Sequence, residues 1–375
     1  MELSIVTYIK TYGLNKAVKD FKLKMKDYGY KILLKYDQIE SDMSFQEVQE
    51  CRGLILEKDT WRVFSLAFKK FFNSAEGHAS KIDWNSAKIL NKYDGSCMSV
   101  YWDWVVEKFF VSTTGMGEGE GEVNNIIESS FADLFWKTIK DVYNLDNNNF
   151  NKGYSYVFEL MTIENHVVKI HNNPSVTLLT IRDLKTLKEL SYEEVRIISE
   201  KLSIPHAEAF DLDFKNPYLL AKTLDGLPFD FEGYVVVDGD FNRIKIKNPA
   251  YLSAHHLKSS TAEYNIVGII KTNEIDEYLS IFKDRKDKIN ELKLKYDEII
   301  LKLENIWGEL AQFKPKNITK EEQKKYAMKV FEIVEKNDVK NFSGLFFALK
   351  DYKVHSVKDY ILNLDNKKLY QILSE

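Results

Sequence analysis

The distribution of glycine and proline constrains the fold of this chain most, because it divides the sequence into two stretches of different composition. Thirteen of the 16 glycines and five of the six prolines precede Tyr251. Turn-forming residues are therefore frequent in the first two thirds of the chain and scarce afterwards. A chain of 375 residues is also longer than most single hydrophobic cores require. We expect two domains, residues 1–254 and residues 255–375.

Before residue 250, short apolar runs alternate with turn residues, which indicates an α+β domain of antiparallel sheets with flanking helices. Runs rich in β-branched and aromatic residues predict the strands. These runs are RGLILE, CMSVYWDWVV, KFFVST, YSYVFELM, SVTLLTI, GYVVVDGD and NRIKIK. Asp238 and Gly239, between the last two runs, are typical of a hairpin turn. Ser191 and Glu194 form a capping-box pattern, which predicts a helix after Ser191.

After about residue 255 the pattern favours a smaller all-α domain. Apolar residues recur three, four or seven positions apart and predict one long amphipathic helix. They are Ile275, Leu279, Phe282, Ile289, Leu292, Tyr296, Ile299, Leu303, Ile306 and Leu310. Pro315 would end this helix. A coiled coil is the alternative, although the apolar stripe is wider than a two-in-seven seam.

Further helices are predicted beyond Pro315. Thr319 and Glu322 form a second capping-box pattern. The apolar face of the helix that follows comprises Tyr326, Val330, Phe331 and Val334. Shorter helices are expected at about residues 342–350 and after Ser356.

The bulk composition excludes several classes of protein. Apolar residues make up 44% and charged residues 29%, as in an ordinary globular chain. Cys51 and Cys97 lack the C-x-x-C spacing of a metal site and are too few for a disulfide framework, so we expect a reducing cytoplasm. No secretion signal or membrane-spanning run is predicted. The net charge of −4 requires any nucleic acid to bind through local basic patches.

Polar residues within the apolar runs of the first domain are candidates for a phosphate site. Lys92, Asp94 and Gly95 form a K-x-D-G sequence behind an apolar run. A solvated lysine beside a hairpin turn is the simpler interpretation of this motif alone, because it is short enough to occur by chance. Glu159 lies in an apolar run, where an unpaired carboxylate is costly and a ligand hydroxyl or a cation would compensate.

Two further patterns lie downstream. FEGYVV places Glu232 at the start of a strand, and RIKIK alternates Arg243, Lys245 and Lys247. Period-two alternation directs the three cations to one face of the strand. Solvated side chains are one interpretation; the other is a bound phosphate, because like charges on one face repel unless an anion lies among them.

The order of these motifs is more specific than any one of them. K-x-D-G, F-E, E-G before an apolar tail, and K-x-K follow one another as in the covalent nucleotidyltransferase superfamily of ATP-dependent ligases and capping enzymes. ECRG, KKFFN, KIKNPAYLSAHHLKSS and KKYAMK closely resemble the bacteriophage RNA ligase 1 family, whose type member is from bacteriophage T4. The resemblance begins at about Tyr36 and is strongest between residues 50 and 260.

This resemblance implies an ATP-dependent RNA ligase with Mg²⁺, or alternatively Mn²⁺, as its metal. It would join 5′-phosphate and 3′-hydroxyl RNA ends through lysyl-AMP and RNA-adenylate intermediates. Lys92 would attack the α-phosphate of ATP, and Glu232 would position the metal and activate the lysine. Lys245 and Lys247 would contact the α-phosphate and, as neighbouring cations, disfavour the ammonium form of the nucleophile.

The same resemblance implies a nucleotide-binding set. The set comprises Tyr36, Arg52, Lys70, Asp94, Gly95, Glu159, Lys245 and Lys247. Within it, Glu159 would bind the ribose, and Arg52 and Lys70, with Tyr36, would hold the outer phosphates. Phe72 and Tyr251 also match family positions, and core packing would explain them equally well.

One position departs from the family pattern. Members usually carry a basic residue before the glycine that is here Gly115, whereas this chain has Thr114. The loop continues with Glu118, Glu120 and Glu122, which would repel phosphate. We expect a mobile acidic loop here, with an additional metal site as the alternative.

The resemblance also suggests partners and rivals. The expected substrate is single-stranded or nicked RNA, with tRNA a candidate, selected by the helical domain. We expect a monomer without a membrane partner, in the host cytoplasm if phage-encoded, with a polynucleotide kinase-phosphatase as a candidate pathway partner. The alternatives are a DNA ligase, a GTP-dependent capping-type nucleotidyltransferase, and a non-catalytic RNA-binding adaptor. The first two usually append a β-barrel whose strands the C-terminal sequence lacks.

Overall fold

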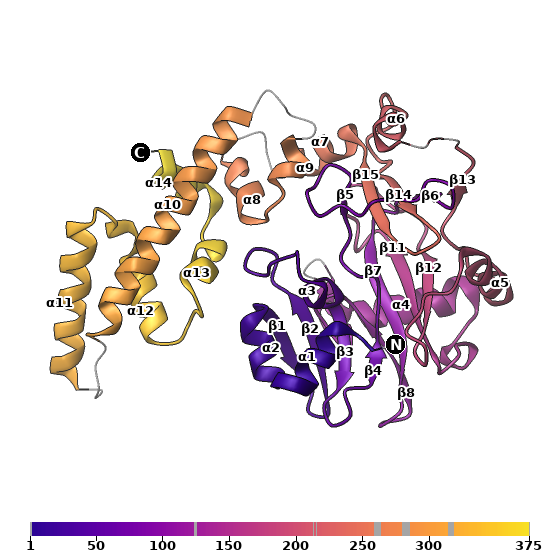
Figure 1. The fold of residues 1–375 in the computed structure, drawn as a ribbon, viewed down its shortest axis with the longest axis horizontal. Coiled ribbons are helices and arrows are strands. Elements are labelled where there is room, and N and C mark those ends of the chain that lie inside the picture. Colours follow the sequence, from indigo (N-terminus) through magenta and orange to yellow (C-terminus); the bar gives the residue numbers. More distant parts are fainter. Residues whose placement is uncertain are drawn as a thin grey trace. The chain divides into compact units, whose positions relative to one another are not determined.

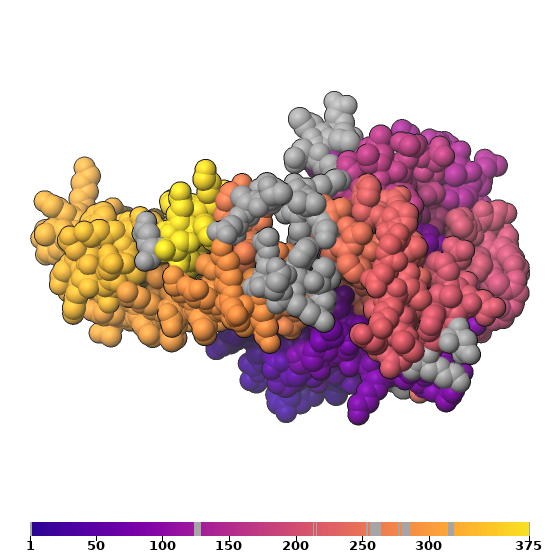
Figure 2. Space-filling model, turned by 90° about the horizontal axis from the view of Figure 1, so that it is seen from above, coloured from indigo at the N-terminus to yellow at the C-terminus, as the bar shows by residue number. Residues whose placement is uncertain are grey.

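The structure, a computed structural model, describes residues 2–123, 126–212, 214, 216–258, 264–279, 286–313 and 319–374. The chain divides into two compact units, residues 1–258 (unit 1) and residues 259–375 (unit 2). Unit 1 combines sheets with helices, and the described residues of unit 2 contain helices and no strand, as the α+β prediction requires (Figure 1). Figure 2 gives the surface of each unit in the same sequence colours.

The first sheet of unit 1 is antiparallel and lies beneath the N-terminal helices. Its strands, in spatial order, are β1 (Leu23–Asp27), β2 (Lys31–Tyr36), β3 (Arg52–Glu57) and β4 (Val63–Ser65). The helices are α1 (Ser4–Tyr12), α2 (Leu14–Asp20) and α3 (Gln46–Glu50). Ile32 and Leu34 share a core with α1 on one face of β2, while Leu33 packs with Tyr101 on the opposite face.

The second sheet is also antiparallel and forms a core with two longer helices. Its strands, in spatial order, are β12 (Ser175–Asp183), β11 (Tyr154–Met161), β7 (Ser96–Asp103) and β8 (Lys108–Ser112). The helices are α4 (Phe131–Tyr143) and α5 (Tyr192–Leu202). The predicted capping box of Ser191 and Glu194 opens α5. β7 ends before Val105 and Val106, which are exposed in the following turn.

The third sheet contains the predicted hairpin. Its strands, in spatial order, are β13 (Ala209–Phe210), β6 (Lys88–Asn91), β14 (Gly233–Val237), β15 (Arg243–Lys247) and β5 (Phe72–Asn73). All neighbours are antiparallel except β15 and β5. The chain leaves β6 and enters β7 through residues 92–95, so the K-x-D-G turn links the third sheet to the second.

Short elements complete unit 1. They are the strand pair β9 (Glu122–Val123) and β10 (Ile126–Ser130), the 3₁₀ turn η1 (Asn147–Asn149), and the helices α6 (Pro217–Lys222) and α7 (Pro249–Lys258). In Figure 1, α6 and α7 lie near the end of the third sheet.

Unit 2 has one hydrophobic core. Its elements are α8 (Asn265–Lys271), α9 (Ile275–Leu279), α10 (Lys286–Ala311), α11 (Lys320–Lys336), η3 (Lys340–Phe342), α12 (Ser343–Lys350), α13 (Val357–Asn363) and α14 (Asn366–Ser374). The buried stripe of α10 packs against α8, α11, α13 and α14, which is the arrangement of a helical domain rather than of a coiled coil. No helix among the described residues is long and apolar enough to cross a membrane.

Details of the predicted helices differ from the structure. α9 and α10 are separate elements, and Phe282 and Pro315 lie outside the described residues. On α11, Phe331 is exposed and Ile333 takes its predicted place in the core. The reason is helical phase: position 333 follows Val330 by three residues, whereas position 331 lies about 100° around the helix from it.

Candidate active site

A cavity of about 260 Å³ in unit 1 collects several of the predicted site residues. Its apolar walls include Leu90, Leu179 and Val235. Arg52, Lys92, Gly95 and Glu159, from β3, the β6–β7 turn and β11, also line it. The fold therefore brings four predicted residues from distant parts of the sequence to one hollow with both apolar and charged walls.

Lys92 follows the last residue of β6, and the neighbouring strand β14 fixes its backbone. The Lys92 N–H donates to the carbonyl oxygen of Gly233 at 3.0 Å. Lys92 Nζ lies 2.6 Å from Oε1 of Glu232, and Lys247 Nζ lies 4.0 Å from the same oxygen. The Lys92 and Glu232 side chains are 21% and 7% exposed, so water screens this pair less than a surface pair. The direct partner of Lys92 is thus the carboxylate that was expected to activate it, and a neighbouring cation, Lys247, approaches the same oxygen.

Lys245 and Lys247 are positioned by the β14–β15 hairpin. Lys247 is the cross-strand partner of Gly233, directly beside Glu232, and Lys245 is the partner of Val235. Cross-strand partners project from the same face of a sheet. Because Val235 lines the cavity, Lys245 lies on the cavity face of β15.

Two glycines allow backbones to approach closely around Lys92. A Cβ at Gly95 would lie 2.3 Å from the carbonyl oxygen of Leu160 on β11. Gly233 has a φ of 139°, and a Cβ there would lie 2.1 Å from the carbonyl oxygen of Ile246 on β15. No side chain fits at either position, so glycine is required to hold the turn against β11 and the start of β14 against β15.

Asp94 is a buried anchor of the same turn. Its Oδ2 accepts hydrogen bonds from the backbone N–H groups of Val168 at 2.9 Å and Lys169 at 2.6 Å. Its Oδ1 accepts from the Tyr251 hydroxyl of α7 at 2.8 Å. Burial, together with Glu232 and Asp94, raises the pKa of Tyr251 well above the ordinary phenol value, which keeps this donor protonated. Asp94 therefore ties the loop after β11 and α7 to the turn that carries Lys92.

Glu159 projects from β11 opposite Cys97 of β7 and lines the cavity. Burial raises its pKa to about 8; the nearby Glu232 adds to the rise, while Lys92 and Arg52 oppose it. At neutral pH this carboxyl is therefore largely protonated, so it can donate a hydrogen bond as well as accept one. The sequence correctly predicted that Glu159 lies where an ionised carboxylate is unfavourable. Protonation removes part of that unfavourable free energy.

A β-bulge directs Arg52 toward the cavity. The pairing of β2 with β3 shifts by one residue at Gly53, which has a φ of 74° and leaves Arg52 opposite Lys35. Without this shift Arg52 would pair with Tyr36, on the other face of the sheet. The bulge places Arg52 Nη1 4.0 Å from Sγ of Cys97 on β7.

Tyr36 and Lys70 form a cluster beyond the lining of the cavity. Lys70 Nζ lies 5.4 Å from the ring centroid of Tyr36 and 5.5 Å from that of Phe72. Tyr36 packs against the core beneath the N-terminal helices, and Phe72 is buried. The two rings hold the Lys70 ammonium by cation–π attraction.

Arg243, the third cation of the RIKIK run, has a protein partner instead of a bound anion. Its Nη1 and Nη2 donate to Oε1 and Oε2 of Glu189 at 2.9 and 2.5 Å. Nη2 of Arg182 donates to the same carboxylate at 2.8 Å. Neither interpretation of the strand cations, solvated side chains or a bound phosphate, describes Arg243, because a carboxylate 54 residues earlier compensates it.

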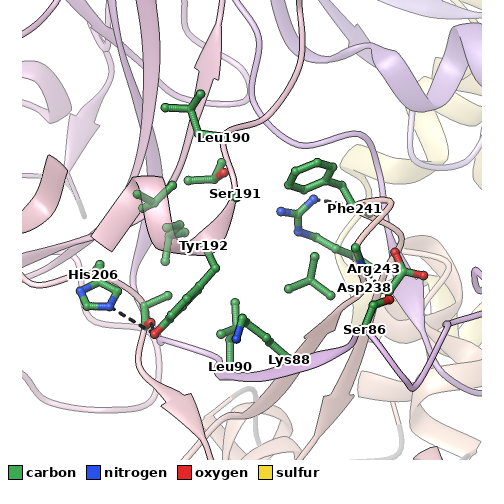
Figure 3. A pocket seen from close by; sticks show the side chains of 16 residues that line it. Ser86, Lys88, Leu90, Leu190, Ser191, Tyr192, His206, Asp238, Phe241 and Arg243 are labelled. Atoms are coloured by element: carbon green, nitrogen blue, oxygen red, sulfur yellow. Dashed lines mark hydrogen bonds between the residues drawn. The ribbon is translucent and has the colours of Figure 1, made fainter. Parts of the chain in front are cut away.

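Arg243 also borders a second cavity of about 180 Å³, which shares the walls Leu90, Leu179 and Ala207 with the first. Figure 3 shows the Arg243 side chain and the His206 side chain on opposite sides of this cavity. The Tyr192 hydroxyl lies 3.2 Å from Nε2 of His206, the contact drawn as a dashed line. The shared apolar walls make the two cavities neighbours within unit 1.

The acidic loop after β8 is tied to the first sheet. Glu118 lies 3.1 Å from Nζ of Lys31, and Glu120 pairs with Lys26 and accepts a hydrogen bond from Tyr28. Thr114 lies against the bulge at residue 53. These contacts connect the acidic side chains to lysines of β1 and β2, and the mobility of the loop stays a prediction. The additional metal site gains no support, because the described part of the chain contains no group of three or more His, Cys, Asp or Glu suited to a metal.

Two residues near the site were not predicted. Lys35 shares a strand face with Arg52, and Nε2 of His171 lies 2.7 Å from the carbonyl oxygen of Asp94. Period-two alternation along β2 from Lys31 could have indicated Lys35. No pattern marks His171, because it lies in the irregular segment between β11 and β12.

Comparison with known proteins shows similarity of this chain to RNA ligases. The family model described as RNA ligase matches residues 50–251. An RNA ligase of Rhodothermus phage RM378 is 25% identical, with 76% of this chain and 79% of that protein aligned. A putative bifunctional polynucleotide kinase/RNA ligase of Autographa californica nuclear polyhedrosis virus is also 25% identical, over 74% of this chain. The chain spans only 41% of the length of that viral protein.

Solved structures give more distant similarity. An archaeal ATP-dependent RNA ligase aligns with 88% of this chain and 90% of its own, at a TM-score of 0.47 and 11% identity. A Naegleria gruberi RNA ligase mutant solved with ATP and Mn aligns with 45% of this chain and 51% of its own, at a TM-score of 0.35 and 19% identity.

Proposed function

The chain belongs to the RNA ligase family, and from this premise we propose that it joins 5′-phosphate to 3′-hydroxyl RNA ends at the expense of ATP, through lysyl-AMP and RNA-adenylate intermediates. One observation supports this function above others. Lys92, in the wall of a cavity, has its Nζ 2.6 Å from Glu232, whose carboxylate is also approached by Lys247. The site therefore combines three groups: an amine, a carboxylate that can accept its proton, and a second cation that can contact phosphate.

In the proposed first step Lys92 is the nucleophile. Glu232 accepts a proton from the ammonium, because a protonated amine has no lone pair with which to attack. The neutral Nζ then bonds to the α-phosphorus, the bond from that phosphorus to the bridging oxygen breaks, and pyrophosphate leaves with the electron pair. The second nitrogen proton passes to water. Lys245 and Lys247 stabilise the charge that develops on the α-phosphoryl oxygens.

The remaining site residues hold the nucleotide. Leu90, Leu179 and Val235 offer apolar walls to a base, and the protonated Glu159 offers a hydrogen bond to the ribose. Asp94 and Gly95 shape the turn that presents the nucleophile. Arg52, with Lys70 and Tyr36 farther out, is assigned to the outer phosphates.

The Glu232 carboxylate fits a divalent cation that is held mainly by substrate phosphates. Glu232 is the nearly buried carboxylate beside the nucleophile, and Mg²⁺ in proteins commonly uses one or two carboxylates plus phosphate oxygens. Mg²⁺ or Mn²⁺, when bound there, would supply positive charge to the triphosphate.

The later steps transfer AMP to the 5′-phosphate of RNA and then displace it with a 3′-hydroxyl. We assign selection of the RNA to unit 2. We further propose that the protein acts as a monomer in the cytoplasm and that its reaction repairs tRNA. A kinase-phosphatase that prepares RNA ends would be its pathway partner, since a viral relative is described as a bifunctional polynucleotide kinase/RNA ligase. The described residues after β15 contain no strand, which argues against the appended β-barrel of DNA ligases and capping enzymes.

A labelling experiment tests the proposal. Incubation with α-labelled ATP and Mg²⁺ should give a labelled protein that is lost in Lys92→Ala. Lys88→Ala is the matched control, because Lys88 is an exposed lysine at the other end of β6 and should keep the label. Absence of an adduct on the wild-type protein would overturn the proposed mechanism, and a stronger adduct with GTP would favour a capping-type enzyme.

A second assay separates the substrate classes. The protein is offered 5′-phosphorylated single-stranded RNA, the equivalent DNA and a tRNA nicked in the anticodon loop, side by side. Joining of RNA but not DNA is expected. Tight RNA binding without joining of any end, at any metal concentration, would instead indicate a non-catalytic adaptor.

A further inference from the structure

The first sheet carries a row of cations, and Lys35 in that row has no role so far. Lys31 and Leu33 of β2 face the second sheet, since Lys31 Nζ lies 2.9 Å from Asp103 of β7 and Leu33 packs with Tyr101. Alternate residues of a strand project from one face. Lys35 therefore also lies on the face of β2 that looks toward β7, the strand whose Cys97 lines the nucleotide cavity.

The bulge at Gly53 sets Arg52 beside Lys35 on this face. In the observed register Lys24, Lys35 and Arg52 are aligned across β1, β2 and β3. Like charges directly opposite one another destabilise a sheet unless something compensates them. Gly53 nevertheless has a positive φ and forms a bulge that aligns Arg52 with Lys35. Such bulges re-aim side chains beside functional sites.

Carboxylates neutralise the other lysines of β1 and β2 that are near this row. Asp37 pairs with Lys24 at 2.9 Å, and Lys26 and Lys31 pair with glutamates of the loop after β8. Within the described part of the chain, by contrast, neither Lys35 nor Arg52 has an ion-pair partner within 4 Å. The two cations without an ion-pair partner are cross-strand neighbours, and one of them, Arg52, lines the cavity.

Lys35 reaches the backbone that follows β8. Its Nζ lies 3.7 Å from the position that a Cβ would occupy at Gly115. The N–H groups of Gly115 and Met116 donate hydrogen bonds to the Thr113 hydroxyl oxygen, at 3.2 and 3.1 Å. Gly115 therefore places no side chain against the Lys35 ammonium, and the Lys35 side chain is only half-buried.

We propose that Lys35, together with Arg52, is a binding site for the β- and γ-phosphates of ATP and for the pyrophosphate that leaves. This inference rests on the function proposed above and adds Lys35 to it. When the bond between the α-phosphorus and the bridging oxygen breaks, negative charge grows on the departing pyrophosphate. Two fixed cations stabilise that charge, and they do so only in the step in which pyrophosphate is present.

Separate assays of the first and last steps test this site. Lys35→Met keeps much of the aliphatic stem and removes the charge. We expect the ATP concentration for half-maximal lysyl-AMP formation to rise about tenfold, and inhibition by pyrophosphate to weaken in the same proportion. Joining of a pre-adenylated RNA to a 3′-hydroxyl end should be unchanged, because that substrate carries neither outer phosphate nor pyrophosphate.

Lys24→Met is the matched control, since it removes a lysine from the same row that Asp37 already neutralises. It should leave both steps unchanged. Unaltered ATP and pyrophosphate dependence in Lys35→Met would overturn the inference. An equal loss in both steps would also overturn it, because that result indicates a structural role. If the wild-type protein forms no lysyl-AMP at all, it is the proposed ligase mechanism that fails.

Discussion

Two clusters in unit 1 each place one carboxylate between two cations, and they differ in exposure and in the kind of cation. In the arginine cluster, Glu189 lies between Arg182 and Arg243, and the three side chains are 5% to 9% exposed. In the lysine cluster, Glu232 lies between Lys92 and Lys247, whose side chains are 21% and 19% exposed. We call the arginine cluster sealed because its side chains are nearly buried, although Arg243 lines both cavities, whereas the two lysine side chains are at least twice as exposed.

The difference shows which charges of a strand are available for chemistry. An arginine fork that binds a carboxylate through two nitrogens is fixed in orientation and stays protonated. A lysine ammonium is a point charge on a flexible stem, and it can change partner or lose its proton. Arg243 and Lys247 alternate on the same strand, β15, yet the first is committed to the fold and the second can serve a phosphate.

The largest effect is expected from the sealed cluster. Glu189→Gln leaves two buried guanidinium groups without their anion, so the free energy of unfolding should fall by about 3 kcal/mol or more. Although burial alone would raise it, Arg243 and Arg182 hold the pKa of Glu189 below its ordinary value. The stabilisation is therefore present at neutral pH and lost as the pH falls below about 4. Urea denaturation at neutral and acidic pH measures both the loss of stability in the variant and its dependence on pH.

Glu193→Gln is the control for this prediction. Glu193 pairs with Arg196 on the exposed surface of α5, where water screens the ion pair, so its loss should change the free energy of unfolding little. If the two variants lost the same stability, the distinction between sealed and open clusters would be wrong.

The lysine cluster should show the reverse pattern. Lys247→Ala removes a cation from a partly exposed group, so stability should change by about 0.5 kcal/mol or less. Lysyl-AMP formation should fall about 100-fold, because one of the charges opposite the α-phosphate is gone. Single-turnover labelling with ATP, beside a thermal melt, measures both quantities.

Lys201→Ala, which removes an exposed lysine from α5, should change neither quantity. Wild-type labelling by Lys247→Ala would contradict the assigned phosphate contact. A variant that lost labelling only because it melted at lower temperature would instead place Lys247 with the structural cluster.

The sequence predicted the lysine cluster better than the arginine cluster. Lys92, Glu232 and Lys247 stand in motifs whose order is informative, and strand alternation places Lys245 and Lys247 on one face. The pairing of Arg243 with Glu189 joins residues that no local pattern connects. Sequence reasoning therefore treated all three cations of β15 alike.

The geometry of the first sheet was the part least accessible to prediction. Gly53 could be recognised as a glycine in ECRG, but its bulge depends on the register of β2 against β3, which long-range pairing decides. The contacts of Glu118 and Glu120 with lysines of β1 and β2 are non-local as well. Local signals fared better: the capping box at Ser191 and the hairpin after β14 occur as predicted.

A smaller loss of stability and labelling is expected where a neutral hydroxyl, rather than a cation, donates a hydrogen bond to a carboxylate of the site. Tyr251→Phe removes the hydroxyl that donates to Asp94 and keeps the buried ring. The free energy of unfolding should fall by about 1 kcal/mol, since Asp94 retains two backbone donors. Lysyl-AMP formation should fall only a few-fold, because the turn that carries Lys92 stays anchored. A loss of labelling as large as that of Lys247→Ala would show that the hydroxyl itself contacts the nucleotide.

The smallest effect concerns Glu159, whose carboxyl shifts in the opposite direction from that of Glu189. No arginine fork holds Glu159, so burial prevails and raises its pKa to about 8. The protonated form that binds nucleotide at neutral pH becomes an anion beside the phosphates as the pH rises through about 8. Binding of a non-hydrolysable ATP analogue to the wild-type protein should therefore weaken roughly threefold to fivefold between about pH 7 and pH 9. Glu159→Gln, which cannot ionise, should bind with little change across that interval; parallel curves for the two proteins would assign the titration to another group.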